Sequence, residues 1–169
     1  YGYLFGSYAR DKDAVGATMM ICEMTAYYKK QNMTLSDALE ALYEKYGVYG
    51  ERVIDIYMEG LDGIEKRKRV MSSLRNNVPV SFGGVAVAEA RDYLEGVIKY
   101  IAAGKTGSTG FEPSDVLYYV LENGDKIVVR PSGTEPKIKI YVLAHGEDKT
   151  ELNKKIEAYC TDANAIAEV

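Results

Sequence analysis

The residues best suited to chemistry lie in one short segment, residues 130–137, which reads Arg-Pro-Ser-Gly-Thr-Glu-Pro-Lys. Two prolines restrict the backbone on either side of a small turn, and the glycine between them lets a ligand approach the main chain closely. Arginine offers a planar fork suited to phosphate oxygens, and serine and threonine add hydroxyl donors. The segment therefore predicts a site for a phosphate dianion. Its candidate binding residues are Arg130, Ser132, Gly133, Thr134 and Lys137.

Four charge-assisted contacts would be enough to make this segment a useful site. A hydrogen bond to a charged group contributes about 1.5–3 kcal/mol. The alternative is an ordinary tight loop with an exposed Arg130. The spacing alone does not choose between the two interpretations.

A second segment, Gly104-Lys105-Thr106, resembles the last three residues of a nucleotide-binding phosphate loop. That motif needs a glycine five residues before Gly104, where this chain has Lys99. It must also open a helix, whereas residues 111–114 continue as a loop. We therefore expect no nucleotide site here.

Isolated ionisable residues give weaker signals. Arg10-Asp11-Lys12-Asp13 places two cations and two carboxylates at an expected helix start, a pattern more typical of a capped and solvated helix entrance. His145 follows a predicted strand and is expected to be a surface residue rather than a base. Cys22 falls on an apolar helix face, so we expect it in a core.

Composition excludes several classes of protein. The chain has 169 residues, a net charge of −4 and a pI of about 5.2, which argues against binding nucleic acid through bulk charge. No apolar run approaches the roughly 18 residues of a membrane span. Two cysteines and one histidine give neither a disulfide framework nor a common zinc site, and no metal ligands are predicted.

The first 46 residues predict two helices and no strong strand. One helix begins near Asp13 and ends near residues 31–32, and the second spans residues 35–46, with Thr34 and Asp37 resembling a capping box. The expected buried stripe of the second helix is Leu35, Ala38, Leu39, Leu42, Tyr43 and Tyr46. Residues 47–50 are expected to form a linker or hinge.

The rest of the chain predicts an α+β domain in which helices cover one face of an antiparallel sheet. Strands are expected at 52–58, 83–93, 116–121, 126–130 and 137–144, and helices at 62–76 and 148–167, with loops at 102–115 and 131–136. Asn123-Gly124 is a strong hairpin signal. In the helix at 62–76, Leu61, Ile64, Val70 or Met71, and Leu74 are expected to be buried, and the charge run at 65–69 to face solvent.

Two helices alone offer too little surface to bury their apolar faces. We therefore expect residues 1–46 to be part of a larger domain whose sheet this chain does not supply. The alternatives are that the helices pack on the second module or on another copy of the chain.

The segment RPSGTEPKIKIY at residues 130–141 closely resembles the C-terminal phosphate-binding loop of the α-D-phosphohexomutases, in the form found in bacterial phosphoglucomutases. The opening YGYLFGSYARDKDAVGATMMICEM resembles the end of that family's third domain. There, a sugar-binding Gly-Glu-Glu-Ser-Tyr-Gly loop precedes a helix that carries Arg-x-Lys-Asp. This chain begins at the tyrosine of that loop, so the glutamates and serine that would recognise sugar hydroxyls are missing.

The resemblance implies a fold and a domain order. Family members have three α/β domains followed by a C-terminal α+β domain similar to the TATA-binding-protein fold. By that resemblance, residues 1–46 are the tail of domain 3 and residues 50–169 are domain 4. The phosphoserine of domain 1 and the Asp-rich magnesium loop of domain 2 are absent from this chain.

The resemblance also implies a function, the interconversion of hexose 1-phosphate and hexose 6-phosphate by a cytoplasmic phosphoglucomutase or phosphomannomutase. Arg130, Ser132, Gly133 and Thr134, with Lys137, would anchor the phosphate that does not react. Lys12 would be catalytic, and Arg10 would contact substrate. Mg²⁺ and a hexose bisphosphate activator are implied for the full-length enzyme, with the hexose phosphate and the missing N-terminal domains as partners. The fragment alone is expected to be inactive.

Two alternatives stay open. The module can be a non-enzymatic phosphate-binding or interaction domain that shares the fold, because fold does not fix function. Within the enzyme class, glucose, mannose and pentose specificity are not distinguished, since the loop that would choose between them is truncated.

Overall fold

The computed structural model describes residues 4–60 and 62–166. Contacts between residues divide the chain into two units, residues 1–47 and residues 48–169. Unit 1 is helical, and unit 2 contains all the strands of the described chain.

Unit 1 consists of helices α1 (Ala14–Lys29) and α2 (Leu35–Tyr46). The Asp13 carboxylate caps α1 by accepting a hydrogen bond from the backbone N–H of Gly16 at 2.9 Å. The predicted capping box of α2 is confirmed. The Thr34 hydroxyl accepts from the backbone N–H of Asp37, and the Asp37 carboxylate accepts from the backbone N–H of Thr34.

The expected burial of the unit 1 helices is wrong. Of the predicted α2 stripe only Ala38 is buried, whereas Leu39, Leu42 and Tyr46 are 45–60% exposed. The apolar face of α1 is equally open, and Cys22, expected in a core, is exposed. The physical reason is that an apolar helix stripe needs a second layer to cover it, and two short helices do not supply one.

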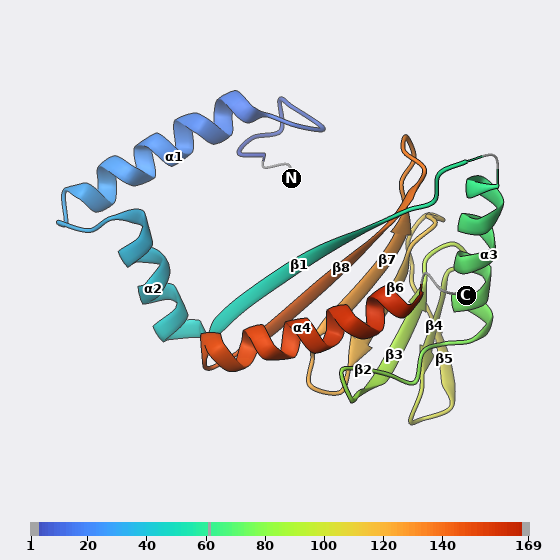
Figure 1. Ribbon diagram of the computed structural model, residues 1–169. Helices are drawn as coiled ribbons and strands as arrows, with labels where there is room; N and C mark the ends of the chain where they lie inside the picture. The colour runs from blue at the N-terminus through green and yellow to red at the C-terminus, as the bar shows by residue number, and fades with distance from the viewer. Residues whose placement is uncertain (1–3, 61, 167–169) are drawn as a thin grey trace. The chain divides into compact units, whose positions relative to one another are not determined.

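Unit 2 is one antiparallel sheet with two helices, α3 (Gly63–Asn76) and α4 (Lys149–Ala165) (Figure 1). Its strand order is β1-β8-β7-β6-β3-β4-β5, and β2 pairs with β3 beside this path. The strands are β1 (Val48–Tyr57), β2 (Ser81–Phe82), β3 (Val85–Asp92), β4 (Val97–Tyr100), β5 (Lys105–Ser108), β6 (Leu117–Leu121), β7 (Lys126–Pro131) and β8 (Lys137–Gly146).

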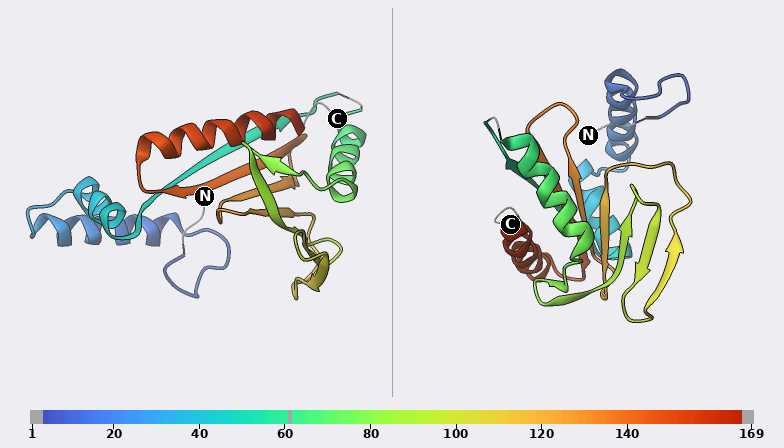
Figure 2. Two further views of the ribbon diagram at one scale, coloured as in Figure 1. Left: turned by 90° about the horizontal axis from the view of Figure 1, so that it is seen from below. Right: turned by 90° about the vertical axis from the view of Figure 1, so that its right-hand side faces the viewer.

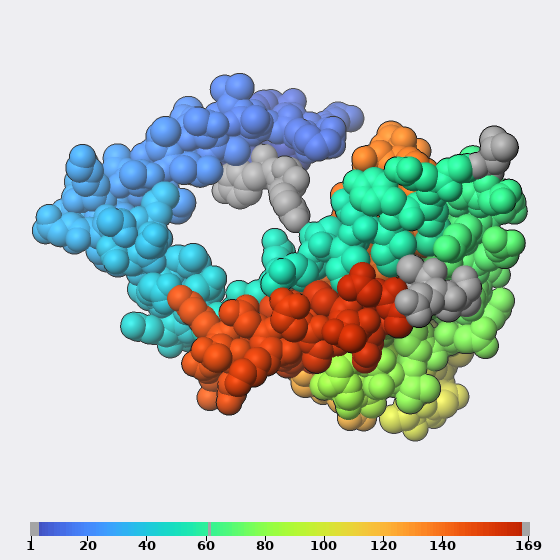
Figure 3. Space-filling model, in the orientation of Figure 1, coloured from blue at the N-terminus to red at the C-terminus, as the bar shows by residue number. Residues whose placement is uncertain are grey.

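Both helices of unit 2 lie on the same side of the sheet, as the right-hand view of Figure 2 shows. Helix α4 runs along β1 and β8, and the space-filling view of Figure 3 shows α4 against β1. The predicted fold class, α+β with an antiparallel sheet and helices on one face, is confirmed. The other face of the sheet carries no helix of unit 2.

The core lies between α4 and the middle of the sheet. As the alternation in β8 predicts, Ile138, Ile140 and Val142 are fully buried. Apolar residues spaced three and four apart along α4 and at its C-cap are also buried, namely Leu152, Ile156, Tyr159, Ala163 and Ile166. These two apolar rows hold β8 in a fixed place, which matters because the phosphate-loop candidate ends where β8 begins.

Several expected boundaries are corrected. Residues 48–50 are not a linker but the start of β1, which pairs with β8 from Val48 onward. The expected loop at 102–115 contains β5, hydrogen-bonded to β4. Ile64 is 55% exposed, whereas Val70, Met71 and Leu74 are buried as predicted. Leu61 lies outside the described residues.

The predicted hairpin between β6 and β7 is confirmed, and its turn contains Gly124 with a φ of 84°. The same turn carries Asp125, a carboxylate that is only 1% exposed. Lys155 and the Tyr159 hydroxyl approach one of its oxygens at 2.8 Å, and Asn123 donates to the same oxygen. His145 is exposed, as expected, and contacts the other oxygen through both its backbone N–H and its ring.

This cluster around Asp125 ties the hairpin to β8 and α4. Burial alone would raise the pKa of Asp125, but the hydrogen bonds from Lys155, Tyr159 and the His145 backbone outweigh it and leave the pKa below its usual value. A carboxylate with a lowered pKa stabilises the fold above its unfolded-state pKa. That contribution is lost as the pH falls through the folded-state pKa.

We predict that Asp125→Asn lowers the free energy of unfolding by about 2–4 kcal/mol at pH 7, because it removes the charge that Lys155 and Tyr159 compensate. The deficit should shrink below about pH 4, where the unfolded wild-type carboxyl takes up its proton. Urea unfolding at pH 7 and pH 3.5 measures both effects. Asp62→Asn is the matched control, since Asp62 forms no side-chain capping bond, and an equal loss in both variants would contradict the prediction.

Candidate phosphate-binding site

A hollow of about 530 Å³ lies at the end of β7, between α3 and the segment that precedes β6. We call it the β7-end pocket. Its lining residues are Arg67, Lys68, Met71, Ser114, Asp115, Val116, Arg130, Pro131, Ser132 and Gly133. The structure thus brings Arg130, Ser132 and Gly133 together in one concavity, as the motif predicts. Thr134 and Lys137 are not among the residues that line it.

Loop 132–136 joins two paired strands and is closed at its base. The backbone N–H of Ser132 donates to the carbonyl of Lys137 at 2.9 Å. The Ser132 hydroxyl is buried and accepts from the backbone N–H groups of Thr134 and Glu135 at 3.4 and 3.2 Å. Gly133 is exposed, and a Cβ atom placed on it would meet nothing within 4 Å. A ligand can therefore reach the main chain at this residue.

Arg130 is the cation that β7 contributes to the pocket. It is paired in register with Lys139 of β8, and its side chain is exposed. Within residues 4–60 and 62–166, no carboxylate forms an ion pair with it. Its guanidinium keeps its full set of donors for an anion.

Lys137 has a different position from the one expected. Its ammonium group lies 3.0 Å from Glu135 and 3.1 Å from Asp55, and donates to the Tyr57 hydroxyl at 3.2 Å. It also stands over the Tyr57 ring. Hydrogen bonds to Glu135 and Asp55 raise the pKa of Lys137, and the Lys137 hydrogen bond lowers the pKa of Asp55. The charge of Lys137 is therefore engaged in fastening the loop to β1.

Arg10 and Lys12 belong to unit 1, where both side chains are exposed. Lys12 lies 3.4 Å from Asp11, and neither partner is buried. Asp13 caps α1 and accepts a hydrogen bond from the Tyr8 hydroxyl, and that bond lowers the pKa of Asp13. Both cations are therefore accessible to solvent on unit 1.

Sequence reasoning missed Arg67. The charge run at 65–69 was expected to face solvent, and its other four residues are exposed. Arg67 is half-buried, and its Nη1 atom donates to the carbonyls of Ser132 and Glu135 at 3.2 and 3.0 Å. The signal available was the spacing of Arg67, Met71 and Arg75, which repeats every four residues and places them on one helix face.

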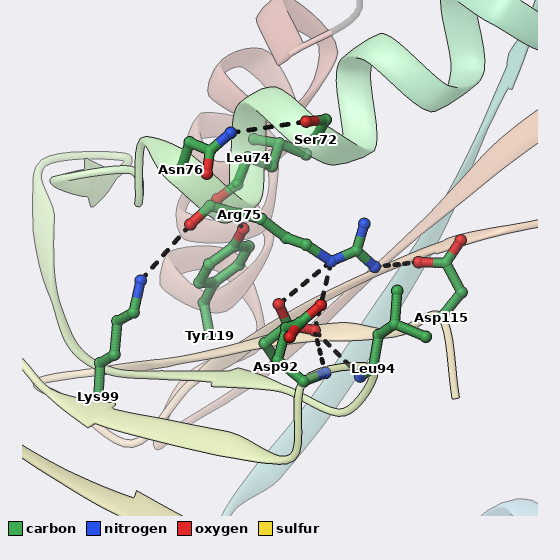
Figure 4. Close-up of polar contacts among 10 residues, drawn as sticks. Ser72, Leu74, Arg75, Asn76, Asp92, Leu94, Lys99, Asp115 and Tyr119 are labelled. Carbon is green, nitrogen blue, oxygen red and sulfur yellow. Dashed lines mark hydrogen bonds and ion pairs between the residues drawn. The ribbon is translucent and has the colours of Figure 1, made fainter. Parts of the chain in front are cut away.

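Arg75 holds one residue of the pocket lining, Asp115, and Figure 4 shows its guanidinium between Asp115 and Asp92. Its guanidinium bridges Asp115, which lines the pocket, and Asp92, whose carboxylate lies 3.1 Å away. Asp92 in turn accepts from the backbone N–H of Leu94 at 3.0 Å. Burial opposes the charge of Arg75, yet the ion pairs with Asp115 and Asp92 raise its pKa. The Asp115 carboxylate is thereby neutralised beside the pocket.

The remaining candidates give no further site. Lys105 and Thr106 lie in β5 rather than at a helix start, so the structure agrees that no nucleotide loop is present there. No group of three or more histidine, cysteine, aspartate or glutamate side chains in the described ranges could hold a metal ion. Within the same residues, every helix is too short or too polar to cross a membrane.

Residues 77–158 match the model of the phosphoglucomutase/phosphomannomutase C-terminal domain. The chain belongs to the phosphoglucomutase and phosphomannomutase family through this domain. The match covers the sheet from β2 to β8 and the first half of α4, including the whole of loop 132–136.

Curated relatives extend the likeness to nearly the whole chain. A phosphoglucomutase of Staphylococcus saprophyticus is 32% identical over 158 residues, and one of Staphylococcus aureus is 34% identical. A probable phosphomannomutase of Haemophilus influenzae is 35% identical over 150 residues. The Staphylococcus alignments cover 94% of this chain and 28% of each relative, and the Haemophilus alignment covers 89% and 27%. The chain therefore spans little more than a quarter of the length of these proteins.

A solved structure shows the same fold. The open form of the Paramecium phosphoglucomutase pp63/parafusin superimposes with a TM-score of 0.57 over 96% of this chain and 28% of that one. The two sequences are 15% identical, so this likeness is one of fold alone.

We predict that Lys137→Met destabilises unit 2 and lowers its Tm by several degrees, because Asp55 and Glu135 lose the cation they share. Its effect on phosphate affinity should be smaller than that of replacing Arg130, since Lys137 does not line the pocket. Thermal unfolding and a phosphate titration of the same variant measure the two effects. Lys126→Met is the matched control from β7, and a variant that keeps its Tm but loses phosphate binding would contradict this assignment.

Proposed function

We propose that the chain is part of a phosphoglucomutase or phosphomannomutase that interconverts hexose 1-phosphate and hexose 6-phosphate. In this proposal the β7-end pocket binds the substrate phosphate that does not react. The observation that carries it is the convergence of Arg130, Ser132 and Gly133 on one hollow, in which Arg130 forms no ion pair with a carboxylate of the described residues. The family match over the same residues supports it.

The role of the pocket is positioning. A mutase of this kind transfers a phosphoryl group at one end of the sugar while the phosphate at the other end stays intact. Holding the intact phosphate fixes the reacting oxygen in line with its partner, which removes translational and rotational freedom before the chemical step. Because the pocket contacts the phosphate and not the sugar, it can hold the substrate in either orientation.

The residue roles follow from the contacts. Arg130 would pair with two phosphate oxygens through its fork, and the backbone at Gly133, with Thr134 beside it, would supply further donors. The Ser132 hydroxyl accepts two N–H groups of the loop and still has its own proton to donate. We assign Lys137 to fastening the loop, and leave Lys12 and Arg10 as the residues proposed to face the reacting phosphate and substrate.

The domain assignment is also a proposal. Residues 1–46 would be the tail of a preceding domain and residues 50–169 the C-terminal domain of the enzyme. The exposed apolar faces of α1 and α2 support this, since they need a covering layer. Mg²⁺ and a hexose bisphosphate activator are implied by the family resemblance. The described residues offer no group of three or more histidine, cysteine, aspartate or glutamate side chains that could hold a metal ion. We expect the enzyme in the cytoplasm.

Arg130→Gln tests the pocket directly. We predict that it weakens the binding of inorganic phosphate by about tenfold or more, because a charge-assisted bidentate contact is lost. The measurement is a titration followed by the amide resonances of residues 132–134. Arg69→Gln, which removes the same charge from an exposed position on α3, should bind within about twofold of wild type. If the amides do not move at tens of millimolar phosphate, the pocket is not a phosphate site.

The second test concerns catalysis. We predict that the purified 169-residue chain does not convert glucose 1-phosphate to glucose 6-phosphate in the presence of Mg²⁺ and a hexose bisphosphate. Its sequence contains neither a Thr-x-Ser-His segment nor an Asp-Gly-Asp run, so it has no nucleophile or metal loop of the family type. A coupled dehydrogenase assay measures the product. Turnover above that of a heat-inactivated sample would contradict the division of roles proposed above.

A further inference from the structure

The middle of helix α3 contributes Arg67, Lys68 and Met71 to the lining of the β7-end pocket. Arg67, Met71 and Arg75 follow one another at four-residue intervals, which places them on one helix face. Arg67 and Met71 line the pocket, and Arg75 holds Asp115, which also lines it. The neighbouring Arg69 is exposed. The helix therefore contributes a built surface to the pocket and not only a solvated charge run.

The guanidinium of Arg67 is only partly used by the protein. Arginine has five N–H donors in a fixed plane. Both hydrogen bonds of Arg67 come from Nη1 and go to the carbonyls of Ser132 and Glu135. Its Nε and Nη2 atoms have no partner among residues 4–60 and 62–166. Arg67, which is half-buried and lines the pocket, thus has the Nε and Nη2 edge of its guanidinium available to donate to a ligand.

We propose that Arg67 is a second phosphate-binding residue, with Nη1 fixing loop 132–136 and its remaining donors contacting the bound anion. The inference rests on the proposed function and extends it to a residue outside the motif. The ligand class is a phosphate monoester dianion, held between one arginine from β7 and one from α3. Two forks from different elements can each take a pair of oxygens.

The charges around the pocket single out Arg67 and Arg130 for this task. Lys68 also lines the pocket, but its ammonium group is paired with Glu65 at 3.0 Å. Asp115 is the carboxylate on the wall, and Arg75 neutralises it. Carbonyl oxygens that point at a dianion repel it. Arg67 binds the carbonyl oxygens of Ser132 and Glu135 and so reduces their repulsion of an anion. The N–H groups that would bind the anion belong to the same loop.

The experiment compares phosphate affinity in Arg67→Gln, Arg67→Lys and Arg69→Gln, measured by titration with inorganic phosphate and, separately, glucose 6-phosphate. We expect Arg67→Gln to weaken binding about tenfold or more and Arg69→Gln to stay within about twofold of wild type. Arg67→Lys should fall between them, because an ammonium group keeps the charge but has three donors instead of five and lacks the planar fork. Equal affinities in Arg67→Gln and Arg69→Gln overturn the inference.

A second readout needs no substitution and separates binding from loop support. In the wild-type chain, the Nε–H resonance of Arg67 should shift on titration with phosphate and saturate at the same concentration as the amides of residues 132–134. If the loop amides shift and the Arg67 resonance does not, Arg67 only supports the loop and the inference fails while the proposed function stands. If neither shifts, the proposed function fails as well. If Arg67→Gln does not fold, this measurement alone decides.

Discussion

A dianion can be held at a protein surface only where cations are not already neutralised by carboxylates, and the residues around loop 132–136 meet this condition through a division of partners. Glu135 and Asp55 share Lys137, Asp115 is bound to Arg75, and Glu65 is bound to Lys68. Each of these carboxylates therefore has a cation other than Arg130. Arg130 is left exposed and unpaired among the described residues, at the mouth of a hollow of about 530 Å³. Without that division, the carboxylates around the loop would compete with a bound anion for Arg130.

This division of ion-pair partners depends on the register in which β1 pairs with β8. In the β1–β8 pairing Asp55 lies opposite Lys139 and Tyr57 opposite Lys137, which puts the Asp55 carboxylate within reach of both lysines. A slip of one residue would turn these side chains to the other face of the sheet. The register is held by the fully buried Ile138, Ile140 and Val142 and, at the far end of β8, by the cluster around Asp125. The apolar core thus sets the electrostatics of the loop at the end of the sheet.

The sequence predicted those features that depend on local chemistry. Alternation in β8, the Asn-Gly turn and the Thr34–Asp37 box each act within a few residues, and the structure confirms them. It also placed Arg130 and Ser132 together, because a short loop keeps them close. It could not predict that Lys137 would turn toward Asp55, 82 residues earlier, or that Arg67 would reach Ser132, 65 residues later. Those contacts arise from tertiary packing, and a run such as Glu-Lys-Arg-Lys-Arg gives no local sign of which cation faces inward.

The burial predicted for the apolar stripe in unit 1 also failed because it depends on tertiary packing. The apolar spacing of α2 is regular, yet Leu39 is 45% exposed and Leu42 49%. Helices with regular apolar stripes normally bury them, because each exposed side chain forgoes about 1.5–3 kcal/mol of transfer free energy. In unit 2 the same type of pattern in α4 is buried throughout. Unit 2 contains the layer that its helix needs, and unit 1 does not. The open stripes of unit 1 are what the domain assignment proposed above requires, because in that proposal a sheet of the preceding domain covers them.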